Sequence, residues 1–141
     1  MRPSVFGYLV LGLGLLLAAA PVFAHHSFMK EFDMRKPVTV TGVVTKIEWS
    51  NPHINFFIDV KDGAGKVTPW GVLSASPTAL ASEGWTRDSI KVGDRITVDG
   101  FLARDGKPFA ATRTVTLADG RTMQANSDGV PPPPRTPRTA Q

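Results

Sequence analysis

Cysteine is absent from all 141 residues of the sequence. This absence excludes disulfide bonds, thiol redox chemistry, iron–sulfur clusters, c-type haem attachment and cysteine-based zinc sites. It also excludes a lipid anchor on a cysteine after the N-terminal apolar run. A stable fold must therefore come from a hydrophobic core, which a single domain of this length can bury without cross-links.

Catalytic signatures are missing as well. No serine stands in a nucleophile elbow, and the glycines follow turns instead of building a phosphate-binding loop. No pair of carboxylates has a spacing typical of acid–base catalysis. The formal net charge of +4 is scattered without a basic stripe, which argues against nucleic-acid binding. We therefore expect no catalytic residues and no nucleic-acid partner.

The N-terminus has the pattern of a cleavable signal peptide. Arg2 precedes an uncharged run from Val5 to Ala20, and small residues mark a cleavage site after Ala24. A transmembrane anchor would need about 20 apolar residues followed by a charged flank. Here the run is shorter and His25 follows it. The sequence thus predicts a periplasmic protein that loses residues 1–24 and keeps no transmembrane anchor.

Three regions should follow the signal peptide. Residues 25–37 form an N-terminal arm, in which Phe28 and Phe32 are spaced to share one face of a helical turn and to pin the arm to the domain. Residues 38–126 form the globular domain, with a last turn and a ragged end after residue 118. Residues 127–141 form a disordered proline-rich tail.

Alternating apolar residues in the domain predict five strands, near residues 38–49, 54–60, 66–74, 96–102 and 109–117. The apolar phase of the first strand slips after Val44, which indicates a bulge that lets one strand join both halves of the sheet. Ser76-Pro77 predicts the start of a short helix, and Gly84 its end. This order predicts an all-β, five-stranded, OB-like Greek-key barrel with one helix between strands three and four.

Four segments together resemble a family of small secreted bacterial proteins that is known only as a domain of unknown function. The segments are AHHSF (24–28), EWSNPH (48–53), GWTRDS (84–89) and VTLADGR (115–121). The resemblance implies a shared fold and export, and it implies no activity. One departure is Pro69 before Trp70, where the family carries a polar residue, and a proline there favours an exposed or edge position.

The three histidines are the main chemical clue. His25 and His26 would open the processed chain, and His53 precedes the second strand. A free α-amine has a pKa near ~7.7–8.0, so its ligating form is accessible. Amine and imidazole nitrogens together favour square-planar copper(II) or a similar divalent metal. Met29 and Met34 add soft ligands suited to copper(I).

Two other interpretations stay open. The terminal histidines could serve only cleavage or solubility, and His53 could only hydrogen-bond within its loop. Alternatively, Trp49, Phe57 and Trp70 form an aromatic face that binds an envelope ligand or partner protein, as OB-folds bind extended chains. Against this, Trp70 and Trp85 could simply fill the core, as large aromatic side chains usually do.

Overall fold

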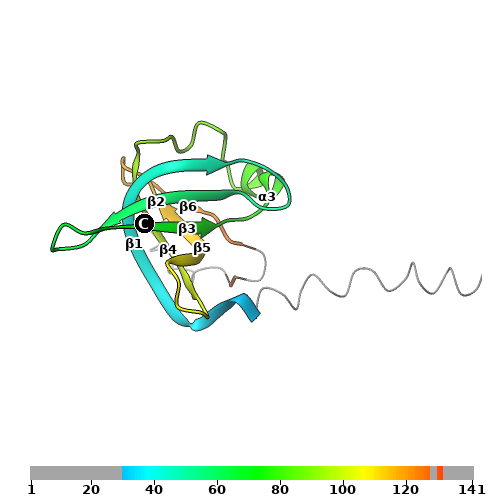
Figure 1. Ribbon diagram of the computed structural model, residues 1–141. Helices are drawn as coiled ribbons and strands as arrows, with labels where there is room; N and C mark the ends of the chain where they lie inside the picture. The colour runs from blue at the N-terminus through cyan, green and yellow to red at the C-terminus, as the bar shows by residue number, and fades with distance from the viewer. Residues whose placement is uncertain (1–29, 128–129, 132–141) are drawn as a thin grey trace, which may run out of the picture.

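The computed structural model describes residues 30–127 and 130–131, which form a mostly β domain with one short helix between its third and fourth strands (Figure 1). The elements are β1 (Phe32–Glu48), β2 (Asn55–Lys61), β3 (Val67–Leu73), α3 (Pro77–Ser82), β4 (Arg95–Ala103), β5 (Phe109–Thr116) and β6 (Thr122–Gln124). The predicted signal peptide, including its cleavage site, lies outside the described residues. In the described part of the chain, no helix has the length and hydropathy needed to cross a bilayer.

The strands form one sheet in the order β3-β2-β1-β4-β5-β6, with antiparallel neighbours throughout. A parallel pairing between β3 and β5 joins Gly71–Leu73 to Phe109–Ala111. This pairing closes a ring of hydrogen bonds through five strands. The class predicted from the sequence is confirmed as mostly β, and the helix lies where it was expected.

The long first strand belongs to both halves of the sheet, as its apolar phase predicted. It pairs with β4 up to Val43 and with β2 from Val43 onward, and its register shifts between Val44 and Lys46. Figure 1 shows β1 curving around one side of the domain. Gly42 permits the close approach of β2, because a Cβ there would lie 2.6 Å from the carbonyl oxygen of Asp59. The strand begins at Phe32, inside the segment predicted to be an arm.

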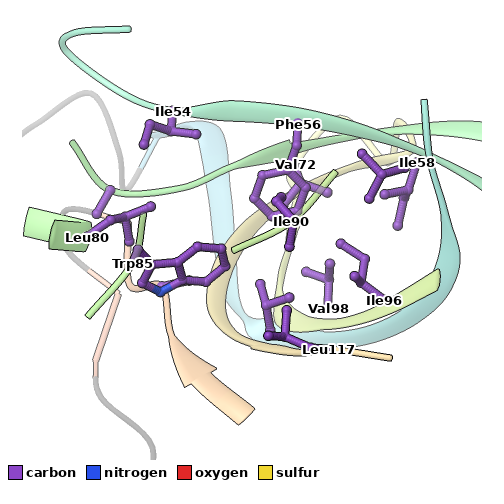
Figure 2. Packing of buried hydrophobic residues seen from close by; sticks show 14 of the residues in the cluster. Ile54, Phe56, Ile58, Val72, Leu80, Trp85, Ile90, Ile96, Val98 and Leu117 are labelled. Atoms are coloured by element: carbon purple, nitrogen blue, oxygen red, sulfur yellow. The ribbon is translucent and has the colours of Figure 1, made fainter. Parts of the chain in front are cut away.

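The main core lies inside the ring and is built from the inward residues of the strands, closed by the helix and the segment after it (Figure 2). Phe56, Ile58, Val72 and Val98 are fully buried. They come from β2, β3 and β4, and the period-two alternation along these strands is visible in the sequence. Burial of such apolar side chains stabilises the fold.

The short helix begins and ends at the predicted residues. Ser76 is its N-cap, and the Ser76 hydroxyl accepts the Ala79 amide at 3.2 Å, with Pro77 at the first helical position. Gly84 follows the C-cap with φ +87°, a conformation that favours glycine. Trp85 follows this turn and lies in the core, where its side chain is 3% exposed. The interpretation of Trp85 as a core residue is confirmed.

The segment after β5 is ordered, so its prediction as a ragged end is wrong. β6 pairs with β5, and Ala125 is fully buried. Ser127 and Val130, assigned to the disordered tail, are also buried, and the Ser127 hydroxyl donates to the Leu73 carbonyl at 2.6 Å. A three-residue strand is too short to show alternation, so its pattern could not be predicted.

A second, smaller cluster covers the opposite side of β4 and β5. Phe32 is fully buried there, with its ring 5.4 Å from that of Phe109, and Phe101 and Val130 complete the cluster. Phe32 therefore pins the start of β1 to the domain from the first residue of the strand, directly after the helical residues 30–31. Phe28 lies outside the described residues.

Candidate functional site

His53 lies in the loop between β1 and β2, directly before Ile54, whose backbone is anchored to residues 74 and 75. The amide of Ile54 donates to the Ala75 carbonyl at 3.0 Å, and the amide of Ser74 donates to the Ile54 carbonyl at 2.8 Å. Ile54 points into the core and His53 is half-buried. The Nδ1 atom of His53 is buried without a hydrogen-bond partner. The fold therefore holds this imidazole in place while leaving one ring nitrogen unused.

The other two predicted metal ligands, His25 and His26, lie outside the described residues, as does Met29. Within residues 30–127 and 130–131, no three histidine, aspartate or glutamate side chains come together as a metal site. Met34, the other predicted soft ligand, packs against the second cluster beside Phe32.

The three aromatic residues predicted to share one face are divided by the strand register. Phe57 pairs with Gly71, and Trp70 pairs with Ile58, a fully buried core residue. Because neighbouring residues of a strand point to opposite faces, Phe57 and Trp70 lie on opposite sides of the sheet. Trp49 and Trp70 pack against the main core, and all three side chains are half-buried. They do not form one continuous strip.

Cations lie over two of these rings. The Arg87 guanidinium carbon is 5.7 Å from the centre of the Trp49 ring, and Lys46 Nζ is 5.4 Å from that of Phe57. The first contact joins the EWSNPH and GWTRDS segments. The contact of Arg87 with Trp49 was not predicted from the sequence. The presence of both segments in the family pattern was a signal that they could lie together. A cation over an indole face at an exposed site contributes about 0.5–1 kcal/mol.

Two buried amide groups were also missed. Gln124 Oε1 and Asn126 Oδ1 are buried without hydrogen-bond partners, beside α3. Both residues fall in the segment predicted to be ragged. The sequence carried no signal for them, because an unpaired amide is defined only by its three-dimensional surroundings.

The carboxyl groups with shifted pKa values are structural. The Arg35 side chain donates to Asp33 at 3.1 Å and lowers the pKa of that carboxyl below its usual 3.8. The Lys107 side chain likewise lowers the pKa of Asp105 across the β4–β5 turn. Arg35 is 84% exposed, so water screens the pair and its contribution is small. Both carboxyl groups form local ion pairs, one at the start of β1 and one in the β4–β5 turn.

Acidification is expected to destabilise the protein through these carboxyls. A carboxyl with a lowered folded-state pKa stabilises the fold above its ordinary pKa, and this stabilisation is lost as the pH falls through the folded-state value. Asp33→Asn and Arg35→Gln should each make the loss of unfolding free energy with acid shallower, as measured by urea unfolding at several pH values. Arg121→Gln tests the pKa of Asp119, which the Arg121 amide and side chain lower. Unchanged acid slopes in all three variants would contradict this account.

The described residues thus define a small, mostly β domain with a closed hydrogen-bond ring and an unused imidazole nitrogen at one loop. The chain belongs to DUF6152, a family of unknown function whose model matches residues 14–112. The membership confirms the family resemblance, of which the first three segments lie within the matched residues, and it brings no activity with it. No curated protein matches the sequence.

Proposed function

We propose that this chain is an exported, non-enzymatic OB-fold protein of the periplasm that binds copper(II) through His25, His26 and His53. The OB-fold assignment is supported by the ring order of five strands, the parallel β3–β5 closure and the position of α3. The bulged β1, which pairs with both β2 and β4, is the coiled first strand of such a barrel. Export is supported by the signal-peptide pattern of residues 1–24.

The observation that carries the metal proposal is the unpartnered Nδ1 of His53. Buried polar atoms almost always have a hydrogen-bond partner, so an exception calls for a ligand or a function. A neutral imidazole nitrogen without a partner offers its lone pair to a metal ion. Ile54, the next residue, is held by two backbone hydrogen bonds, and the ring of His53 must turn to expose its buried Nδ1 to a metal.

The nitrogen ligands of this proposed site favour copper(II) over zinc. After cleavage at Ala24, His25 would offer its α-amine and imidazole, and His26 would offer a backbone amide and an imidazole. Amine, amide and imidazole nitrogens in one plane suit copper(II), whereas zinc prefers tetrahedral ligation. His53 would supply a nitrogen from the folded domain, which would tie the N-terminal segment to the loop before β2.

Copper(II) titration of protein processed in a periplasm tests this proposal. We expect one tight site by calorimetry, with nitrogen ligation in the electron paramagnetic resonance spectrum. His53→Ala should weaken binding about tenfold or more, which corresponds to about 1.4 kcal/mol. Ser50→Ala is the matched control, because Ser50 is exposed in the same loop. Equal affinity in the His53→Ala variant would contradict the proposal and indicate an ordinary exposed terminus.

Two further changes separate the metal site from the fold. Acetylation of the His25 α-amine removes the chelating amine and should abolish the planar spectrum. Deleting His25 and His26 should remove tight binding while leaving the thermal midpoint of the apo protein unchanged. Loss of the fold on that deletion would instead make these residues structural.

A second candidate function is binding of an envelope ligand or partner protein through the aromatic face at Trp49. The half-buried Trp49 ring under Arg87 favours it, since aromatic and guanidinium planes together bind extended chains. Trp49→Phe should keep the stacking, and Trp49→Ala should weaken the affinity for cell-wall oligosaccharides, read by tryptophan fluorescence. Absence of any saturable oligosaccharide response in the wild type would exclude this candidate.

A further inference from the structure

A cavity of about 310 Å³ lies between α3 and the segment that follows β5. It is remote in sequence from the histidines, and its lining combines apolar and polar groups. The apolar part comes from Ala79 and Leu80 of the helix, and Leu80 belongs to the main core. The polar part comes from Ser82, Glu83, Gln124 and Asn126. The volume matches the lower end of the range for small-molecule sites.

The segment that carries the two amides is fixed by its backbone. The Gln124 carbonyl accepts the indole N–H of Trp85 at 2.6 Å, and the Ala125 carbonyl accepts the Ser74 hydroxyl at 3.0 Å. The Ala125 amide donates to the Arg113 carbonyl at 3.0 Å. Residues two apart in an extended chain point to the same side, so Gln124 and Asn126 both face the cavity opposite Ala125. The cavity is therefore lined by positioned groups.

Both amide side chains have a buried oxygen without a partner, Oε1 of Gln124 and Oδ1 of Asn126. A buried acceptor left unpaired is destabilising. Both oxygens are closed to solvent, so each amide must turn toward the cavity before a ligand with at least two hydrogen-bond donors can reach them. Carboxylates and phosphates, which only accept, cannot satisfy them.

The remaining lining narrows the ligand class. Among the described residues that line the cavity, Glu83 carries the only charge, and that charge favours a cation. Ala79 and Leu80 favour methylene groups beside the cation. A guanidinium group presents several N–H donors in a planar fork, so it can reach two separate acceptors at once. We propose that this cavity binds an alkylguanidinium cation, with the guanidinium on Gln124 and Asn126 and the alkyl chain on α3.

Agmatine is a suitable probe, titrated into the full processed chain without metal. Trp85 reports binding directly, because its indole N–H is hydrogen-bonded to the Gln124 carbonyl. We expect a saturable shift of the Trp85 indole signal in proton–nitrogen correlation spectra. Putrescine tests an ammonium in place of the guanidinium and should bind more weakly. The neutral alcohol 1-pentanol should give no saturable shift.

Removing an amide oxygen should weaken agmatine binding, whereas replacing an amide by a carboxylate should strengthen it. Gln124→Leu and Asn126→Leu remove the acceptors and should each weaken agmatine binding about tenfold or more, without loss of thermal stability. Gln124→Glu places a carboxylate at the same position and should tighten agmatine binding several-fold. Ser82→Ala is the matched control, since the Ser82 hydroxyl already donates to the Ala79 carbonyl at 2.7 Å.

The proposal is overturned if agmatine gives no saturable shift, or if the leucine variants keep the wild-type affinity. The first result would mean that water alone fills the cavity and satisfies the two oxygens. The second would place the cation elsewhere on the surface. Neither result bears on copper binding, which is measured separately and depends on other residues.

Discussion

Gly100→Ala is expected to lower the free energy of unfolding by about 3 kcal/mol or more. A Cβ at this position would overlap the carbonyl oxygen of Ala111 and lie 3.0 Å from its carbonyl carbon. Gly100 pairs with Thr112 beside the register shift between β4 and β5, so the opposing atoms belong to a hydrogen-bonded strand. Backbone atoms cannot move aside as a flexible side chain can, and relief requires separating the two strands.

Urea unfolding, followed by circular dichroism, measures this loss. Gly63→Ala is the matched control, because a Cβ there meets nothing within 4 Å and the residue lies in the exposed β2–β3 turn. We expect that variant to stay within about 0.5 kcal/mol of the wild type. A Gly100→Ala protein with the wild-type denaturation midpoint would show that β4 and β5 do not approach as closely as described.

Phe32→Ala should cost about 3–5 kcal/mol, the usual range for deleting a fully buried phenylalanine. Phe32 is 0% exposed, and its ring lies against Phe109 and Phe101 in the second cluster. Its backbone pairs with Ala103, so the ring holds the first residues of β1 on β4. Removing the ring leaves a cavity and releases the start of the strand.

The same unfolding measurement on Val67→Ala provides the control. Val67 is 49% exposed on β3 and should contribute little. A loss for Phe32→Ala no larger than for Val67→Ala would show that the strand start is only an arm. Deletion of His25 and His26 should leave the stability unchanged, whereas Phe32→Ala should lower it. This difference would show that the part of the N-terminal segment needed for folding begins between these positions.

The elements of the core were accessible from the sequence because each depends on local pattern. Alternation between apolar and polar residues predicted the second strand, and the phase slip after Val44 predicted the bulge of β1. Ser76-Pro77 and Gly84 predicted both ends of α3. Capping, turn chemistry and strand alternation each depend on a few neighbouring residues, so they can be recognised in a short stretch of sequence.

The predicted sites depended on information that the sequence does not contain. The face on which Phe57 or Trp70 lies is fixed only when the β2–β3 register pairs Phe57 with Gly71. A shift of one residue would have moved a whole strand to the other face. Likewise, the contact of Arg87 with Trp49 joins segments far apart in the chain.

The sequence by itself determined the class of the domain, its helix, its first-strand bulge and its membership of the family whose model matches residues 14–112. Tertiary structure alone decided that β6 pairs with β5, that Phe32 begins a strand, and that Gln124 and Asn126 face a cavity with unpaired oxygens. The physical reason is the distance along the chain over which each interaction acts. Strand alternation and helix capping are local, whereas strand register, cavity formation and the pairing of buried polar atoms arise only when distant segments meet.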